Sequence, residues 1–260
     1  MTRIIAIANQ KGGVTKTTTT FNIAAALAAA GKRVLMVDMD SQASLTISAG
    51  LEPLEMEHTI CDVLDKSPIP TKDSIIKLGH ISNLSIIPSI IDLAVLETEL
   101  LARPAREKIL ARVLAQVEKD FDFILIDCPP QLSILTMNGL CAAEEVIIPV
   151  KTDYLAYRGL KQLNDTINDM KEYVNPKINV VGIIAALYEM NIIEDKEILE
   201  KLIKEYNVIG VIKKAAAAKK GIYDGVPVVL QNANSPVAVE YMKIGTMVLD
   251  GKYKRSEQII

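Results

Sequence analysis

The chain has 260 residues, of which 50% are hydrophobic and 23% charged, and its formal net charge is -3. This composition excludes a largely disordered chain and gives no overall attraction to nucleic acid, so any DNA contact needs a local basic patch. The three cysteines, Cys61, Cys128 and Cys141, lack Cys-x-x-Cys spacing, which argues against a disulfide framework or zinc site and favours a reducing, cytoplasmic location.

Apolar strands and helices alternate from the N-terminus. The continuously apolar run 4–8 predicts a strand buried on both faces, and an alanine-rich helix is expected over 17–30. Gly31 ends that helix, because glycine is favoured just past a helix C-terminus. A second buried strand is expected over 34–37.

The same alternation continues through the rest of the chain. Apolar runs predict further strands at 84–88, 123–126, 146–150, 180–184 and 208–212. Helices are predicted over 94–118 with an interruption at Pro104, 159–173, 194–206 and 237–248. This pattern indicates a single-domain α/β fold with a mostly parallel twisted sheet and helices on both faces. No Gly/Ser/Pro-rich linker divides the chain, so we expect one domain over 1–250 and a polar tail over 251–260.

The loop after the first strand reads Asn9-Gln10-Lys11-Gly12-Gly13-Val14-Thr15-Lys16-Thr17-Thr18. A strand, a glycine pair, a Lys-Thr pair and a helix in this order predict a phosphate-binding loop, because glycines let backbone N–H groups approach phosphates. Lys16 then neutralises the β and γ phosphates, and the Thr17 hydroxyl is a Mg²⁺ ligand. A glycine-containing turn that happens to precede a helix is the competing interpretation, and the matched order disfavours it.

Carboxylates follow two other predicted strands. Asp38 and Asp40 come after the strand at 34–37, and Asp127 comes after the strand at 123–126. Ligands in parallel α/β sheets bind beyond the carboxyl ends of strands, so these side chains are expected beside the loop. Asp127 has the position of a Walker B aspartate, while Asp38 or Asp40 would orient an attacking water or hold a Mg²⁺-bound water. Each segment alone is also compatible with an ordinary strand end or solvated loop.

These segments together resemble the ParA/MinD family of deviant Walker A ATPases, in particular its ParA-type partition proteins and their Soj branch. The resemblance rests on Lys11-Gly12-Gly13-Val14-x-Lys16-Thr17-Thr18, Val37-Asp38-Met39-Asp40, Asp127-Cys128-Pro129-Pro130, the run 146–160 and Gly225-Val226-Pro227-Val228. It covers nearly the whole chain, and the pair Lys11 and Lys16 is quite specific. It implies an ATPase of the P-loop fold with ATP and Mg²⁺ as cofactors, and residues 11–18 as the nucleotide-binding loop.

The resemblance also implies roles for single residues. Lys11 would reach across an ATP-dependent homodimer to the partner's phosphates and stabilise the transferred phosphoryl group, as an arginine finger does. Asp40 matches the residue that positions the lytic water, so Lys11, Lys16 and Asp40 are the candidate catalytic residues. Asp38, Asp40 and Asp127 are the candidate switch residues, and Thr17, Asp40 and Asp127 the candidate metal ligands. Hydrolysis in this family is slow and needs a partner.

Similarity to ParA further implies nonspecific DNA binding and stimulation by a ParB-like centromere-binding protein, which would move or space plasmids or chromosomes. A cytoplasmic, nucleoid-associated location follows. Candidate DNA-binding residues are Lys213, Lys214, Lys219 and Lys220, which flank four alanines. On a helix Lys213 and Lys220 share a face, and lysines neutralise phosphates without reading bases. The family has arginines in this region and this chain has Ala217 at one such position, so a solvated helix end is the competing interpretation.

Thr15 departs from the family, which has glycine there. That position tends to need φ above zero, where a β-branched residue is strained by about 1–3 kcal/mol. A penalty of about 1.4 kcal/mol weakens binding tenfold. Thr15 is therefore expected to weaken or abolish ATP binding, and the alternative function is a nucleotide-impaired DNA- or partner-binding scaffold.

Two other branches of the family fit less well. A membrane-surface ATPase like MinD needs an amphipathic C-terminal helix, but the tail 251–260 has basic residues and almost no apolar face. The iron-protein branch needs a cysteine pair at a dimer axis, and nothing in the sequence indicates one. No run of about 18 apolar residues occurs, so no membrane span is expected.

Overall fold

An eight-stranded sheet forms the centre of the computed structural model, which describes residues 1–214 and 225–254. The strand order is β3-β4-β2-β5-β1-β6-β7-β8, and every pairing is parallel except the antiparallel pair β3–β4. The strands are β1 (Arg3–Ile7), β2 (Val34–Asp38), β3 (Ile76–Lys77), β4 (Leu84–Ile87), β5 (Phe123–Asp127), β6 (Glu145–Lys151), β7 (Asn179–Tyr188) and β8 (Val208–Lys213). The predicted fold class, a mostly parallel α/β sheet, is confirmed.

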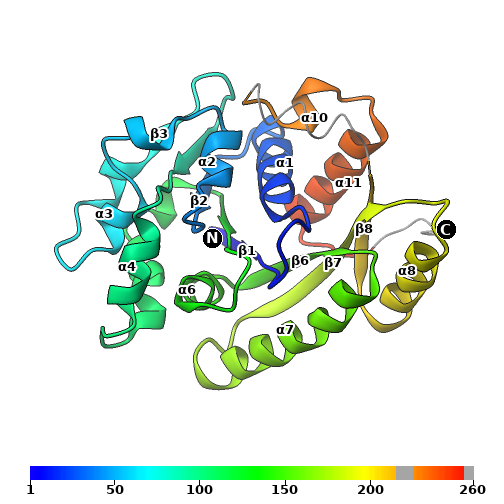
Figure 1. Cartoon of the computed structure of the whole chain (residues 1–260). Helices are drawn as coiled ribbons and strands as arrows, with labels where there is room; N and C mark the ends of the chain where they lie inside the picture. Colours follow the sequence, from blue (N-terminus) through cyan, green and yellow to red (C-terminus); the bar gives the residue numbers. More distant parts are fainter. Residues whose placement is uncertain (215–224, 255–260) are drawn as a thin grey trace.

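Helices cover both faces of this sheet (Figure 1). The α-helices with described bounds are α1 (Lys16–Ala29), α2 (Ser44–Ser48), α3 (Ile60–Leu64), α4 (Leu93–Leu100), α5 (Ile109–Leu114), α6 (Ile134–Ala142), α7 (Tyr154–Tyr173), α8 (Ile193–Glu205), α10 (Val228–Gln231) and α11 (Pro236–Asp250). Helices α1, α10 and α11 pack on one face around an aliphatic core, and helices α3 to α8 pack on the other face around a second one. In the described ranges, no helix is both long enough and apolar enough to cross a membrane.

The differences from the predicted elements have local causes. Helix α7 begins at Tyr154 rather than at residue 159, because the Asp153 side chain accepts a hydrogen bond from the Ala156 N–H and caps the first turn. The predicted helix over 94–118 is divided into α4 and α5 around Pro104. The sequence did not predict the short elements β3, α2, α3, α6 and α10, most of which are too short to show a period. The predicted division at residue 250 stays a prediction, although α11 ends there and Gly251 caps it with φ 67°.

Strand pairing brings three carboxyl ends to one point. Asp127 at the end of β5 lies opposite Ile7 of β1 on one side and opposite Asp38 of β2 on the other. The loop that follows β1 and the two acidic strand ends therefore meet at the same edge of the sheet, as the sequence predicted. This edge carries the candidate site.

Candidate functional site

The loop between β1 and α1 has two residues in the left-handed backbone region. Gly13 has φ +71° and Thr15 has φ 69°, both in the left-handed region that glycine adopts most easily. Gly12 and Gly13 are exposed, whereas Val14 is buried and holds the loop to the core. The predicted positive φ at Thr15 is confirmed.

Lys16 begins helix α1 and is almost fully buried, with 8% of its surface exposed. Its ammonium group donates a hydrogen bond of 3.0 Å to the backbone carbonyl of Lys11, so the side chain folds back over the loop. Burial lowers the pKa of Lys16, and the nearby carboxylate of Asp127 opposes that shift. A cation held inside the loop in this way is placed to meet an anion that enters it.

Asp127 lies directly beneath the first turn of α1. The hydroxyl groups of Thr17 and Thr20 donate hydrogen bonds of 2.7 and 3.2 Å to its two carboxylate oxygens. Burial raises the pKa of Asp127, and the carboxylate of Asp38 on the neighbouring strand raises it further. Two of the three predicted metal ligands, Thr17 and Asp127, are therefore in direct contact. Thr20 is a member of this cluster that the sequence did not predict.

Asp38 is fully buried and ties the end of β2 to helix α2. Its Oδ2 accepts hydrogen bonds from the backbone N–H and the hydroxyl of Thr46, at 2.9 and 2.8 Å. Its Oδ1 accepts one from the Asp40 N–H at 3.2 Å. Burial raises the pKa of Asp38 to about 6, and the three donors limit the rise. The Asp40 side chain is half-buried and accepts a hydrogen bond from the Gln42 N–H, so Asp38 is the structural carboxylate and Asp40 the accessible one.

A hollow of about 340 Å³ opens above the loop. One wall is made by Gly12, Gly13 and residues 15–18, and the opposite wall by Asp40, Ser44, Ile47 and Ser48. The structure therefore brings the predicted loop, Lys16, Thr17 and Asp40 around one space, with Asp127 just below it. No cluster of three acidic, histidine or cysteine side chains that could hold a metal ion occurs in the part of the chain that the structure describes.

Lys11 lies apart from that hollow. The Lys11 Cε is 3.8 Å from the position that a Cβ would take on Gly159, in the first half of α7. Hydrogen bonds from the Ala156 N–H and from Lys151 lower the pKa of Asp153, and the charge of Lys11 adds a smaller lowering. Its neighbour Gln10 donates a hydrogen bond to the Gly159 carbonyl at 2.8 Å. Lys11 and Lys16 thus point to different places, and of the two only Lys16 lines the hollow.

The predicted DNA-binding lysines are only partly described. Lys213 ends β8 and is exposed, and Lys214 follows it. The Lys214 ammonium group forms an ion pair with Glu189 at 2.6 Å, which reduces its availability to a phosphate. Lys219 and Lys220, like Ala217, lie outside the described residues.

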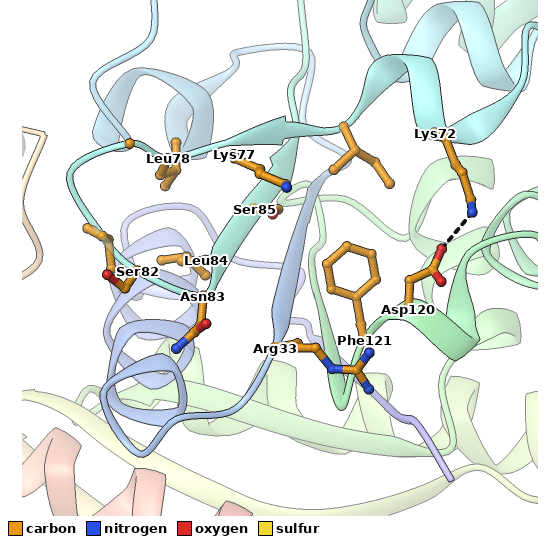
Figure 2. A pocket seen from close by; sticks show the side chains of 13 residues that line it. Arg33, Lys72, Lys77, Leu78, Ser82, Asn83, Leu84, Ser85, Asp120 and Phe121 are labelled. Carbon is orange, nitrogen blue, oxygen red and sulfur yellow. Dashed lines mark ion pairs between the residues drawn. The ribbon is translucent and has the colours of Figure 1, made fainter.

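A second hollow, of about 860 Å³, lies at the opposite edge of the sheet (Figure 2). Its lining residues Arg33, Asn83 and Phe121 precede β2, β4 and β5, so they sit at the amino ends of these strands. Lys72 is paired there with Asp120 at 3.0 Å. It contains none of the predicted site residues.

Comparisons with known proteins find relatives and solved structures that cover nearly the whole chain. A family model described as an AAA domain matches residues 2–180. The sporulation initiation inhibitor protein Soj of Bacillus subtilis is 36% identical over 252 residues, which are 95% of this chain and 98% of Soj. The chromosome partitioning protein ParA of Caulobacter vibrioides is 31% identical over 97% of this chain and 96% of its own. A cobyrinic acid a,c-diamide synthase from Mycobacterium smegmatis, solved with bound ADP and magnesium, has a TM-score of 0.85 and 34% identity, with 99% of this chain and 100% of that chain covered.

Proposed function

The chain belongs to the ParA/Soj-type partition ATPases of the ParA/MinD family, and from this premise we propose that it uses slow ATP hydrolysis to partition or position DNA. The observation that carries the proposal is the meeting of the phosphate-type loop, Lys16 and the Thr17–Asp127 contact at one hollow, in a chain that is 36% identical to Soj over nearly its full length. ATP and Mg²⁺ are the cofactors.

The residues around the hollow fit ATP and Mg²⁺. Positive φ at Gly13 and Thr15 lets the loop curve at the N-terminus of α1, where phosphates are favoured. Lys16 supplies a buried cation, and Thr17 with Asp127 supplies a hydroxyl and a carboxylate side by side. When bound, Mg²⁺ would neutralise phosphate charge at this pair. Asp40 is the accessible carboxylate and is proposed to orient the attacking water.

We further propose that ATP holds two copies of the chain together. Several large apolar side chains are exposed on elements that follow the carboxyl ends of the strands: Ile47 on the hollow wall, Leu155 at the start of α7 and Ile193 at the start of α8. Leu155 and Ile193 are 66% and 75% exposed, so a partner surface that covered them would gain apolar burial. Lys11 lies beside the same part of α7, and we propose that its ammonium group reaches the partner's phosphates across this surface.

DNA and a ParB-like protein are the proposed partners. Lys213 and Lys214 give a described basic pair at the end of β8, and Lys219 and Lys220 extend it in sequence. Contacts of this kind bind the phosphate backbone without reading bases, and their affinity falls with salt. The cargo is then set by the centromere-binding partner rather than by this chain.

One experiment tests the DNA part of the proposal. DNA affinity with ATP is measured against salt for the wild type, for a variant with Lys213, Lys214, Lys219 and Lys220 replaced by alanine, and for a control with four exposed lysines elsewhere replaced (Lys66, Lys72, Lys161 and Lys171). The first variant should bind more weakly with a smaller salt slope, and the control should keep the wild-type slope. An equal slope in all three proteins would place the DNA surface elsewhere.

A further inference from the structure

Thr15 holds a conformation that its side chain disfavours. It is the N-cap of α1, with φ 69° and ψ 24°, and its carbonyl accepts the Thr19 N–H at 2.8 Å to start the helix. Threonine is β-branched, and residues of this kind rarely occupy the left-handed region. A strained residue persists where its surroundings hold it, so the contacts of the Thr15 side chain are the informative ones.

The Thr15 hydroxyl points into the protein. Its Oγ1 is buried and has no hydrogen-bond partner among residues 1–214 and 225–254. The Tyr241 hydroxyl of α11 lies beside it, without the geometry of a full hydrogen bond, and Tyr241 shares a hydrogen bond of 3.1 Å with the Thr19 hydroxyl. Burial raises the pKa of Tyr241 to about 12, so it keeps its proton and has one hydrogen to donate. Tyr241 is therefore the neighbouring group best placed to satisfy Thr15.

Helix α11 presents Tyr241 from a fixed position. A Cβ on Gly245, one turn further along, would lie 2.6 Å from the Ala26 Cβ, so α1 and α11 touch closely there. The neighbouring Glu240 accepts the Val211 N–H at 2.9 Å and ties α11 to β8. These two contacts hold Tyr241 in place, so a hydrogen bond between Tyr241 and Thr15 requires a movement of the loop rather than of α11.

We propose that Thr15 is a positioning residue of the phosphate loop, and that its hydroxyl bonds to Tyr241 when the loop holds phosphate. The three hydroxyls of Thr15, Tyr241 and Thr19 then form one buried chain from the loop through α11 to the first turn of α1. A small rotation of the Thr15 side chain completes the missing hydrogen bond between the Thr15 and Tyr241 hydroxyls. This bond is favourable because a buried hydroxyl without a partner is costly. The strain at Thr15 exists before nucleotide arrives, so it reduces folding stability rather than ATP affinity. This inference rests on the proposed nucleotide site.

The test separates the effect of the Thr15 hydroxyl from the effect of its branched shape. ATP affinity with Mg²⁺ is measured by calorimetry for the wild type, Thr15→Val, Thr15→Ser, Tyr241→Phe and the double variant Thr15→Val with Tyr241→Phe. Valine keeps the branched shape without the hydroxyl, and serine keeps the hydroxyl. Melting temperature without nucleotide is measured for each protein, because a purely structural role would appear there.

We expect Thr15→Val and Tyr241→Phe each to weaken ATP binding by about three- to tenfold, the loss of one hydrogen bond, and the double variant to lose no more than either. Thr15→Ser should stay within about twofold of the wild type. Thr15→Val should melt no lower than the wild type, because it removes a buried hydroxyl without a partner. Wild-type affinity in Thr15→Val, or losses that multiply in the double variant, would overturn the inference alone. Absence of ATP binding by every protein, the wild type included, would overturn the proposed function and this inference with it.

Discussion

Replacing Asp127 with asparagine should stabilise the protein when no nucleotide is present. Asp127 is 1% exposed, and it faces the carboxylate of Asp38 across the strand pair. Asparagine has nearly the same shape, and the Thr17 and Thr20 hydroxyls can rotate so that one donates to the amide oxygen and the other accepts from the amide nitrogen. The substitution therefore removes a buried charge and keeps the hydrogen bonds.

The raised pKa of Asp127 determines whether Asp127→Asn stabilises the protein and how that effect changes with pH. The folded protein holds this proton more tightly than the unfolded chain, whose carboxyl titrates near 3.8. The resulting stability is fully present below that value and is lost as pH rises through the folded pKa. Each unit by which the pKa of Asp127 is raised corresponds to about 1.4 kcal/mol, and the opposing charge of Lys16 is already included in that raised pKa. We therefore expect a gain of at least about 1–3 kcal/mol and a rise in melting temperature of at least about 2–10 °C in alkaline buffer.

Thermal unfolding of the wild type and Asp127→Asn across pH 5 to pH 9 gives the measurement. The difference between the two melting temperatures should grow with pH and then level off. Asp122→Asn is the matched control: Asp122 is half-buried and its pKa is lowered by Arg33, so its removal should give no gain at alkaline pH. A melting temperature of Asp127→Asn below the wild type at high pH would mean that Lys16 fully compensates an ionised Asp127, and the reasoning would be refuted.

Three further outcomes are expected. Asp40→Ala should keep ATP binding and lose turnover, because Asp40 lines the hollow but Lys16 supplies the positive charge there. Normal phosphate release would remove Asp40 from the mechanism. Lys11→Ala should bind ATP within about threefold of the wild type but fail to dimerise with ATP in light scattering; an intact dimer would contradict the role in trans. Gly245→Ala should lower stability by about 1–3 kcal/mol through overlap with Ala26, whereas Gly79→Ala, with open space around it, should not; equal melting of the two variants would refute the close approach.

The sheet and the loop were predictable because their signals are strong and local. Apolar runs long enough to be buried strands mark β1, β2, β5 and β6, and the glycine pair with Lys16 marks the loop. Parallel pairing then forces the strand ends together, so the meeting of Asp38 with Asp127 followed from topology. The positive φ at Thr15 also followed, because the family pattern has glycine at that position.

Other parts of the site depend on contacts that have no signal in the sequence. Thr20 and Thr46 become partners of Asp127 and Asp38 only when α1 and α2 lie against the strand ends. Tyr241 is distant in sequence from Thr15 and Thr19, and it meets them only because α11 packs against α1. Helix α2 has five residues, too few to show a helical period, so its part in the site could not be read beforehand.

Calorimetric titration of this chain with ATP and Mg²⁺, beside Lys16→Ala and Thr15→Gly, tests the central claim most directly. We predict clear binding by the wild type, binding about three- to tenfold weaker by Thr15→Gly, which lacks the hydroxyl that bonds to Tyr241, and none by Lys16→Ala, because Lys16 is the buried cation of the loop. Binding by Thr15→Gly alone would mean that threonine disables the loop. Unchanged affinity in Lys16→Ala would contradict the assignment of this loop as the phosphate site.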